Sequence, residues 1–262
     1  MKLAPSASLA GLLALVACAP APGASGGPPP AASEAERGYT PPPAVTAAIR
    51  AGEGRVQLSG TAPPASRVRV ASPAGREMFA LADAGGVWRM ALPPAADVRL
   101  FGVSAPVAGR LVQSEGYLAV TAGGEAAQLR AGSGAVVLDR PGPGIALLAA
   151  DFDRKGGTVV SGRAPAQAPV KITVDSLGVG HASADVSGRF MLALDKPLSP
   201  GVHAIAASTG GARAEVSLTV SPPAPLAAGP FRAESTPDGW RVDWLTPGGG
   251  VQSTVLFQAG GA

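Results

Sequence analysis

One stretch of this sequence occurs twice. Residues 157–194 match residues 55–92 without a gap, and the matched positions are Gly, Pro, Asp and alternating apolar residues. The pair Ser59-Gly60 recurs as Ser161-Gly162 at this single offset. A fixed offset with apolar residues at period two between turn residues is typical of a β-rich unit that was duplicated. The chain is therefore predicted to fold as a tandem array of two β modules.

Length and composition agree with this prediction. A chain of 262 residues has room for two domains that each bury a core without disulfides or metal. The sequence holds 36 Gly and 27 Pro, and both residues weaken helix interiors. Short strands joined by many turns fit this composition better than long helices, so we expect an all-β fold.

The repeat sets the boundaries of two modules, 44–121 and 145–220. In the second module Val170–Val174 alternates apolar and polar residues, as a half-buried strand does. Asp83 and Asp185 lie at equivalent positions, and each precedes a Gly by three residues. We interpret both as turn residues that bond backbone amides, and we expect Gly86 and Gly188 to take positive φ.

The second module resembles the bacterial immunoglobulin-like modules that occur in tandem on surface proteins, adhesins and envelope lipoproteins. The resemblance is carried by Gly162, Ala164-Pro165, Val170, Ile172, Asp185, Gly188, Phe190, Leu192, Pro200-Gly201 and His203. It implies two antiparallel β-sandwiches of about seven strands each. The first module departs from the pattern after Leu92, where Pro93–Asp97 replaces the Pro-Gly-x-His segment.

The segments outside the repeat are predicted separately. Residues 122–144 match nothing in the other copy and are expected to be an extended connector with one short strand or hairpin near Ala135–Leu138. Residues 221–262 begin with a Pro-rich linker and continue into a predicted β-hairpin formed by Trp240–Trp244 and Val251–Phe257. A lone hairpin is marginal in water. The tail is therefore expected to dock on a module edge in cis or on a partner in trans.

The hairpin contains the one candidate interaction surface. Trp240, Val242 and Trp244 share one face of the predicted strand. Such a stripe is either core or an exposed platform for a sugar ring or a protein partner. Sequence alone leaves both interpretations open.

The N-terminal segment predicts an address rather than a domain. Residues 1–17 combine Lys2 with the short apolar run Leu9–Val16, which is too short to span a bilayer. Leu15-Val16-Ala17-Cys18 resembles the lipobox of bacterial lipoproteins, and the resemblance implies that Cys18 is lipidated with acyl chains such as palmitate. The alternative is an ordinary secretory signal with a chance cysteine.

Residues 18–43 follow as a Pro/Gly-rich tether, predicted to be disordered because it has few large apolar residues. A partner-binding polyproline segment is its alternative role. In the lipoprotein sorting rule, Asp after the lipidated cysteine retains the protein in the inner membrane. Ala19 stands there instead, so we expect outer-membrane anchoring, facing the periplasm or the cell surface.

Composition excludes several functions. The formal net charge of +3 is small and dispersed, which argues against nucleic-acid binding. Cys18 is the sole cysteine, so no disulfide or thiolate metal site is expected. His181 and His203 lack metal-ligand spacing. Asp151 and Asp153 could contribute to a Ca²⁺ site between modules, but they supply few of the 6–8 oxygens that calcium needs.

These observations favour a non-catalytic envelope lipoprotein that acts as a structural or protein-interaction module, with a membrane anchor and an envelope protein partner. The alternative is a peptidoglycan- or glycan-binding lipoprotein, for which the Trp240, Val242 and Trp244 face is the evidence. An enzyme is disfavoured because usable spacings of catalytic residue types are missing. No catalytic residue, cofactor or metal is predicted.

Overall fold

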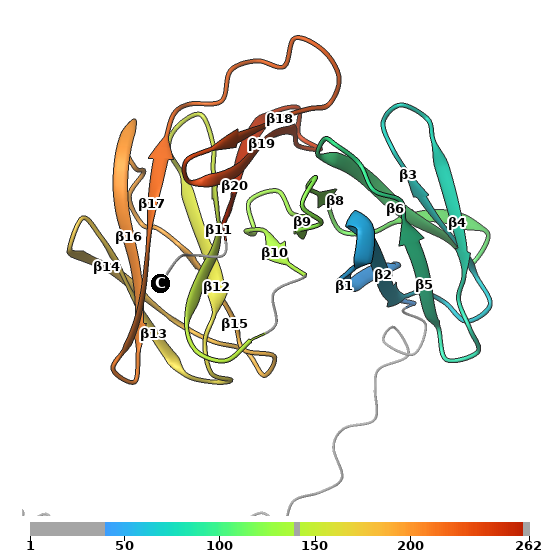
Figure 1. Cartoon of the computed structure of the whole chain (residues 1–262), viewed down its shortest axis with the longest axis horizontal. Helices are drawn as coiled ribbons and strands as arrows, with labels where there is room; N and C mark the ends of the chain where they lie inside the picture. The colour runs from blue at the N-terminus through green and yellow to red at the C-terminus, as the bar shows by residue number, and fades with distance from the viewer. Residues whose placement is uncertain (1–39, 139–141, 259–262) are drawn as a thin grey trace, which may run out of the picture. The chain divides into compact units, whose positions relative to one another are not determined.

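The computed structural model describes residues 40–138 and 142–258 (Figure 1). Within these residues the fold is all β, with a single 3-10 turn, η1 (Gly52–Gly54), and no α-helix. The described part of the chain accordingly contains no helix with the length and apolar character needed to cross a membrane. The all-β prediction is confirmed.

The first module is a sandwich of two antiparallel sheets. Its strands are β1 (Ala44–Ala51), β2 (Arg55–Thr61), β3 (Arg67–Ala71), β4 (Glu77–Leu81), β5 (Val87–Leu92), β6 (Arg99–Val107), β7 (Arg110–Gln113), β8 (Tyr117–Val120), β9 (Ala126–Leu129) and β10 (Val136–Val137). One sheet has the order β1-β2-β5, and the other has the order β10-β9-β8-β6-β3-β4, with β7 paired to β6. Alternating apolar residues such as Leu58 and Trp88 fill the space between them.

The second module repeats this arrangement. Its strands are β11 (Ala146–Phe152), β12 (Thr158–Arg163), β13 (Pro169–Val174), β14 (Leu177–Ser183), β15 (Arg189–Ala193), β16 (Gly201–Thr209), β17 (Ala212–Val220), β18 (Phe231–Thr236), β19 (Gly239–Leu245) and β20 (Val251–Phe257). One sheet has the order β15-β12-β11-β20-β19-β18, and the other β14-β13-β16-β17. Phe152, Phe190 and Ile205 lie in the core between them. Both modules have the Ig-like sandwich architecture that the sequence predicts.

The structural repeat is longer than the sequence repeat. Strand β6 begins at Arg99 and β16 at Gly201, which keeps the offset of the matched region although the sequences there no longer resemble each other. Each of these strands ends in a two-residue turn with positive φ at both positions, Ala108-Gly109 in the first module and Gly210-Gly211 in the second. Hydrophobic patterning and turn geometry therefore preserve the fold where sequence identity is lost.

The first strand of each module carries the same irregularity. The register between β1 and β2 shifts between Val45 and Ala47, and the register between β11 and β12 shifts between Leu147 and Ala149. A β-bulge of this kind bends the strand that carries it and locally interrupts its pairing. The shared bulge shows that β1 and β11 are equivalent strands.

The repeated Ser-Gly pair has a packing reason. A Cβ on Gly60 would lie 2.0 Å from the Ala44 carbonyl oxygen and 2.5 Å from the Trp88 ring. A Cβ on Gly162 would lie 2.5 Å from the Phe190 ring in the same way. Glycine is required at both positions because the aromatic side chain of the neighbouring strand packs directly on the backbone.

The two aspartate turns form as predicted. Oδ1 of Asp83 accepts hydrogen bonds from the amides two and four residues further on, both at 2.9 Å. Asp185 accepts the equivalent bonds at 2.8 and 2.9 Å. Gly86 and Gly188 take φ values of 78° and 79°. The Asp at this position is a structural turn residue in each module.

Residues 122–144 were expected to be an extended connector, but their described stretch up to Leu138 belongs to the first module. They contain β9 and β10, which pair with each other and attach to the outer edge of β8. Leu138 reaches the first module's core. The predicted strand near Ala135–Leu138 corresponds to β10, whereas β9 was not predicted because its sequence, AAQL, has weak β propensity. The first module therefore extends beyond residue 121.

The tail docks on the second module in cis. The expected hairpin is present as β19 and β20, and a third strand, β18, precedes it. Strand β20 pairs antiparallel with β11, and the pairing runs from Ala149 to Phe152 on β11. Val255 and Phe257 of β20 enter the second module's core. The tail is thus an integral part of a six-stranded sheet.

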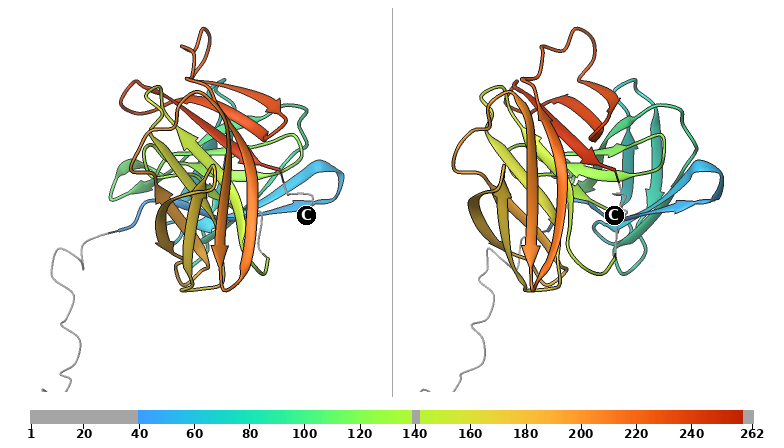
Figure 2. Two further views of the ribbon diagram at one scale, coloured as in Figure 1. Left: turned by 90° about the vertical axis from the view of Figure 1, so that its left-hand side faces the viewer. Right: turned by 60° about the vertical axis from the view of Figure 1, so that its left-hand side comes forward.

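A third apolar core joins the added strands of the two modules, and we call it the junction core. Its buried members are Val98, Leu100, Ala119, Ala127, Leu129, Ala135, Ala149, Val242, Trp244 and Leu256. They come from β6 and the residue before it, β8, β9 and the β9–β10 loop on one side, and from β11, β19 and β20 on the other. Figure 2 gives two further views of these strands. The described residues from Thr40 onwards accordingly fall in one compact unit.

Candidate functional site

The predicted lipidation site cannot be placed in this structure. Cys18 and the remainder of residues 1–39 lie outside the described residues. Its lipidation stays a prediction from the sequence.

The predicted interaction surface on β19 is largely buried. Val242 and Trp244 are 0% exposed and belong to the junction core, while Trp240 is half-buried at its margin. A stacking platform needs an accessible ring face, and burial removes it at Trp244. The hypothesis of an exposed Trp-Val-Trp surface is therefore corrected, because the stripe packs against strands of the first module.

Trp244 makes specific contacts in the junction core. Its ring meets the Tyr117 ring edge to face, with centroids 5.8 Å apart and an interplanar angle of 81°. Its indole Nε1 donates a hydrogen bond to Thr254 Oγ1 at 3.0 Å. A buried indole N–H normally finds such an acceptor. Trp244 thus links the first module's β8 to the second module's β20.

Asp151 is the centre of a buried polar network beside this core. Its Oδ1 accepts hydrogen bonds from Thr254 Oγ1 at 2.5 Å and from Gln252 Nε2 at 3.0 Å, and its Oδ2 accepts one from the Ala135 amide at 2.7 Å. Burial raises the pKa of Asp151 to about 6, although these hydrogen bonds and the charge of Arg130 favour the ionised form. The hydrogen-bond donors therefore offset only part of the free-energy cost of burying the ionised carboxylate.

The same network holds the β9–β10 loop against the tail. Gln252 accepts a hydrogen bond from the Gly132 amide at 3.2 Å, and its amide also lies 3.4 Å from the Arg130 carbonyl oxygen. Ser161 of β12 donates to the Ala135 carbonyl at 2.8 Å. The loop of the first module is therefore tied by polar contacts to two strands of the second.

The opposite face of β19 carries a buried ion pair. Arg241 Nε donates to Asp243 Oδ1 at 2.8 Å, and Ser253 Oγ donates to the same oxygen at 2.7 Å. Arg241 Nη2 also donates to the Ser221 carbonyl at 3.0 Å, and Arg232 pairs with the second oxygen of Asp243. A buried ion pair with this many hydrogen bonds fixes geometry more than it adds stability. Both faces of β19 are thus committed to internal packing.

Asp151 and Asp153 are used in ways that differ from a calcium cage. Asp151 is enclosed by the donors named above. Asp153 Oδ1 accepts the amides of Lys155 and Gly157 at 2.8 and 3.0 Å, which makes it a turn residue. Among residues 40–138 and 142–258, no group of three or more His, Cys, Asp or Glu side chains could hold a metal ion.

His203 forms a structural clamp at the tip of the β13–β14 hairpin. Its Nδ1 lies 2.8 Å from Asp175 Oδ2 and its Nε2 lies 2.9 Å from the Ser199 carbonyl oxygen. Burial lowers the pKa of His203, but the bonds to these two acceptors and the Asp175 charge outweigh it, so the pKa is raised. His181 lies on β14, opposite Lys171 of β13. The two histidines share no site.

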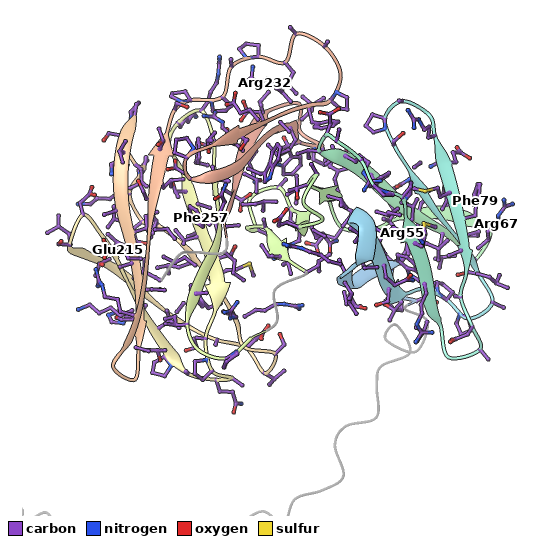
Figure 3. All side chains as sticks on the ribbon, viewed as in Figure 1. Arg55, Arg67, Phe79, Glu215, Arg232 and Phe257 are labelled. Atoms are coloured by element: carbon purple, nitrogen blue, oxygen red, sulfur yellow. The ribbon has the colours of Figure 1, made fainter. Side chains whose placement is uncertain are left out.

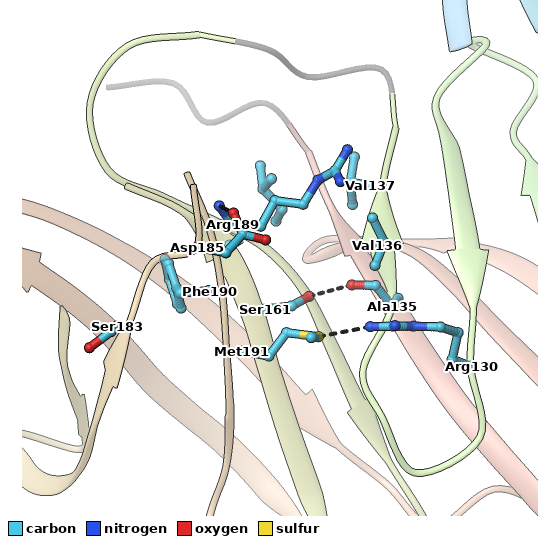
Figure 4. A pocket seen from close by; sticks show the side chains of 12 residues that line it. Arg130, Ala135, Val136, Val137, Ser161, Ser183, Asp185, Arg189, Phe190 and Met191 are labelled. Atoms are coloured by element: carbon cyan, nitrogen blue, oxygen red, sulfur yellow. Dashed lines mark hydrogen bonds between the residues drawn. The ribbon is translucent and has the colours of Figure 1, made fainter. Parts of the chain in front are cut away.

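A cavity of about 360 Å³ lies between the β9–β10 loop and the β12–β15 pair (Figure 4). Ser161 lines it but donates to the Ala135 carbonyl, and Arg130 Nη2 lies 3.0 Å from Met191 Sδ. Asp185 also lines it, and its carboxylate serves the turn described above. No histidine or cysteine belongs to the described lining. Within the described lining, neither Ser161 nor Ser183 is hydrogen-bonded to a carboxylate or an imidazole.

Sequence reasoning missed the Asp151 network. The available signal is the run Gln252-Ser253-Thr254, three polar residues in a strand whose other members are apolar. Such a run indicates either an exposed edge or a polar partner inside the fold. The internal repeat does not indicate this network, because the first module has Ile49 at the position equivalent to Asp151.

Comparisons with known proteins give a likeness of fold. No protein-family model matches the sequence, and no curated protein matches it. Selenomethionine-substituted chicken interferon gamma receptor alpha chain is 13% identical, with a TM-score of 0.24, over 70% of this chain and 99% of that one.

Two further solved structures come from proteins named for biofilm or adhesion. The BSP domain of a biofilm associated protein is 14% identical, with a TM-score of 0.22, over 68% of this chain and 29% of that one. A tetra-tandem repeat in the extending region of a large adhesion protein is 16% identical, with a TM-score of 0.26, over 79% of this chain and 60% of that one.

Proposed function

We propose that this chain is a lipid-anchored lipoprotein of the cell envelope whose two Ig-like modules form a non-catalytic structural or protein-interaction body. The anchor is Cys18, the tether is the segment that follows it, and the proposed interaction body is the compact unit that begins at Thr40. A partner protein in the envelope is the expected ligand.

The junction core is the observation that carries the proposal. Each module contributes a non-repeated segment to this core. The first module contributes the β9–β10 extension, and the second contributes the three-stranded tail. Tandem modules joined only by a linker move independently, whereas an apolar core between them fixes their relation. A rigid double module suits a spacer or a docking body.

The lipid anchor is supported by the sequence of the N-terminal segment. One acyl chain gives only marginal membrane binding, and two or more hold a protein stably. The resemblance of Leu15–Cys18 to a lipobox implies an anchor with two or more acyl chains. Outer-membrane location follows from Ala19 by the sorting rule given above.

The burial of β19 residues argues against the glycan-binding alternative. Two of the three residues on which it rested, Val242 and Trp244, are buried. Trp240 is left as a single half-buried ring, and carbohydrate stacking uses an exposed face. A pull-down on purified sacculi serves as the control for this alternative, and retention that is abolished by Trp240→Ala would favour it.

The anchor is tested with Cys18→Ser and metabolic labelling by radioactive palmitate. Wild type is expected to carry the label and to fractionate with the outer membrane, and the variant is expected to lose the label and become soluble in the periplasm. Ala19→Asp is the matched variant, expected to keep the label and move to the inner membrane. A Cys18→Ser protein that is still labelled and still membrane-bound would contradict the proposal. Crosslinking in the native membrane then identifies the partner.

A further inference from the structure

The two modules differ at one position on the core face of equivalent strands. Strands β6 and β16 keep the offset of the repeat, so His203 of the second module corresponds to Phe101 of the first. Phe101 is 3% exposed and belongs to the first module's core. His203 precedes the core residues Ile205 and Ala207 on the same face of β16, and its side chain is 12% exposed. A titratable ring therefore stands where the other copy has an apolar one.

Both ring nitrogens of His203 face hydrogen-bond acceptors. Nδ1 lies 2.8 Å from Asp175 Oδ2, and Nε2 lies 2.9 Å from the Ser199 carbonyl oxygen. Asp175 is ionised at neutral pH, because the bonds from His203 and from the Ala204 amide lower the pKa of its carboxyl. Neutral imidazole has one N–H and can donate to one acceptor, whereas the imidazolium donates to both. The geometry therefore suits the charged ring.

One partner of the ring is the turn between β13 and β14. Asp175 and Ser176 form this turn with φ values of 50° and 70°, in the left-handed region that L-residues rarely adopt. Asp175 Oδ1 accepts the Ala204 amide at 3.0 Å, so the turn is held to β16 by a bond that does not involve the ring. In a neutral ring the charge of Asp175 keeps the remaining proton on Nδ1. The bond that is lost is therefore the one from Nε2 to Ser199.

The other partner is the segment 195–200, which leads into β16. Pro197 and Pro200 have no amide hydrogen, so the segment has few backbone donors. The Leu198 amide donates to a carbonyl of the β11–β12 turn at 2.9 Å, which ties the middle of the segment. The Ser199 carbonyl is tied by the ring. Loss of that bond releases the end of the segment that adjoins β16.

A cavity of about 450 Å³ adjoins the ring, between the β13–β14 hairpin and residues 194–199. Its apolar lining includes Val174, Val179, Leu194 and Leu198, which belong to the second module's core or pack against it. Movement of the segment therefore uncovers apolar surface of the second module.

Asp175 is the ionic partner of the ring among the charged groups around it. The charged groups of the surrounding elements are Asp175, Asp195 and Lys196 in the cavity lining, Arg213 and Glu215 on β17, and Asp238 in the β18–β19 turn. Arg213 and Glu215 bond to each other at 2.6 Å (Glu215 is labelled in Figure 3), and Asp238 accepts an amide of β17 at 2.7 Å. Strand β17 places Leu218 opposite His203.

We propose that His203 is a pH-operated clamp in the second module. Its charged ring bridges the Asp175 carboxylate and the Ser199 carbonyl, and loss of one ring proton releases residues 195–200 and opens the apolar cavity. Because the pKa of His203 is raised in the folded protein, the clamp is closed below the ordinary value of 6.5 and opens as the pH rises through the higher folded value. The first module, with Phe101 at this position, has no such response.

The first test is an NMR titration of the full chain with Cys18→Ser between about pH 5.5 and pH 9. His181 and His203 are the only histidines, so His181→Asn leaves one imidazole signal to follow. The titration midpoint is expected above 6.5, and Asp175→Asn is expected to lower it. Asn tolerates positive φ and can accept the Ala204 amide, so this variant keeps the turn.

The second test is hydrogen exchange of the amides of residues 195–201 over the same pH range. Exchange is expressed as protection factors, which removes the intrinsic pH dependence of the reaction. Protection is expected to fall about tenfold or more as His203 loses its proton, the effect of one lost charge-assisted hydrogen bond. The amides of residues 95–99, at equivalent positions of the first module, are the internal control. His203→Phe, which installs the residue of the first module, is expected to remove the pH dependence.

The proposal is overturned if the titration midpoint of His203 lies at or below 6.5, or if the protection of residues 195–201 is unchanged while the ring titrates. It is also overturned if His203→Phe keeps the same pH dependence. Should His203→Phe not fold, the wild-type titration and Asp175→Asn decide the question. A failure of palmitate labelling leaves these measurements unaffected, so the anchor and the clamp are tested independently.

Discussion

The two modules descend from one repeated unit, yet they are extended on different edges. The first module adds β9 and β10 to the outer edge of β8, and the second adds β20, β19 and β18 to the outer edge of β11. A sandwich of this type has open edges on both sheets, and an open edge is a liability for aggregation. Among the described strands, each copy pairs the edge that the other leaves unpaired. The repeated sequence therefore accounts for the two similar sandwiches, and the non-repeated segments account for the contacts that join the two modules.

The largest effect is expected from Trp244→Ala. Truncating a fully buried Trp costs about 3–5 kcal/mol of unfolding free energy, and here it also removes the contact between Tyr117 and the tail. Urea unfolding followed by circular dichroism measures this change, and loss of the junction core is expected to split one transition into two. Trp240→Ala, at a half-buried position, is the matched control. An equal cost for the two variants would show that the junction core does not couple the modules.

The two aspartate turns test whether the repeated units are energetically alike. Gly86→Val and Gly188→Val each force a β-branched residue to positive φ and place its Cβ 2.6 or 2.7 Å from a carbonyl oxygen. We expect each to cost about 3 kcal/mol or more, measured by thermal and urea unfolding. Gly75→Val separates the causes, because Gly75 has φ +81° with open space around it. If one of the two turn variants is tolerated, the equivalence of the modules fails at that position.

Asp151 is expected to make stability depend on pH in the second module only. Burial raises its pKa to about 6, so the folded protein holds this proton more firmly than the unfolded chain does. The stability that the bound proton contributes is therefore present at low pH and is lost as the pH rises from near 4 through 6, by at most about 3 kcal/mol. Ile49 stands at the equivalent position of the first module and cannot titrate.

The measurement is the unfolding free energy of wild type and Asp151→Asn between pH 4 and pH 7.5. Subtracting the two curves cancels all other carboxylates, and the difference is expected to shift in favour of the variant as the pH rises. A pH-independent difference would mean that Asp151 is ionised throughout this range.

The smallest effect concerns the turn after the sixth strand of each module. Ala108 has φ +47°, where the second module has Gly210 at φ +52°. Replacing Ala108 with Gly relieves a left-handed conformation of an L-residue, and this gain exceeds the entropy that glycine adds to the unfolded chain. We expect Ala108→Gly to raise the unfolding free energy by up to about 1 kcal/mol. Gly210→Ala is the reciprocal variant, and the comparison fails if both changes have the same sign.

The repeat made the sandwich predictable. Asp83, Asp185 and the glycines that follow them encode local turns, and alternating apolar residues encode the faces of the strands. These signals act over a few residues, so they can be recognised in one sequence without knowledge of distant contacts. The predicted strands Trp240–Trp244 and Val251–Phe257 were found for the same reason.

The partner of each strand edge could not be predicted from local sequence signals. Strand β9 is alanine-rich and β10 has two residues, so neither carries a strong local signal. The Trp-Val-Trp stripe of β19 indicates an apolar face but does not indicate which residues cover it. Asp151 is buried because Thr254 and Gln252, about a hundred residues away in the sequence, bond to it in the fold.

The sequence by itself determined the strands, their turns and the duplication, because those features depend on period-two patterning and on backbone conformations that Gly, Pro and Asp favour locally. The tertiary structure decided which edges pair among the described strands and where Trp244 is buried. Pairing of strand edges is made by backbone groups that every residue carries, so no residue type records which partner an edge will take.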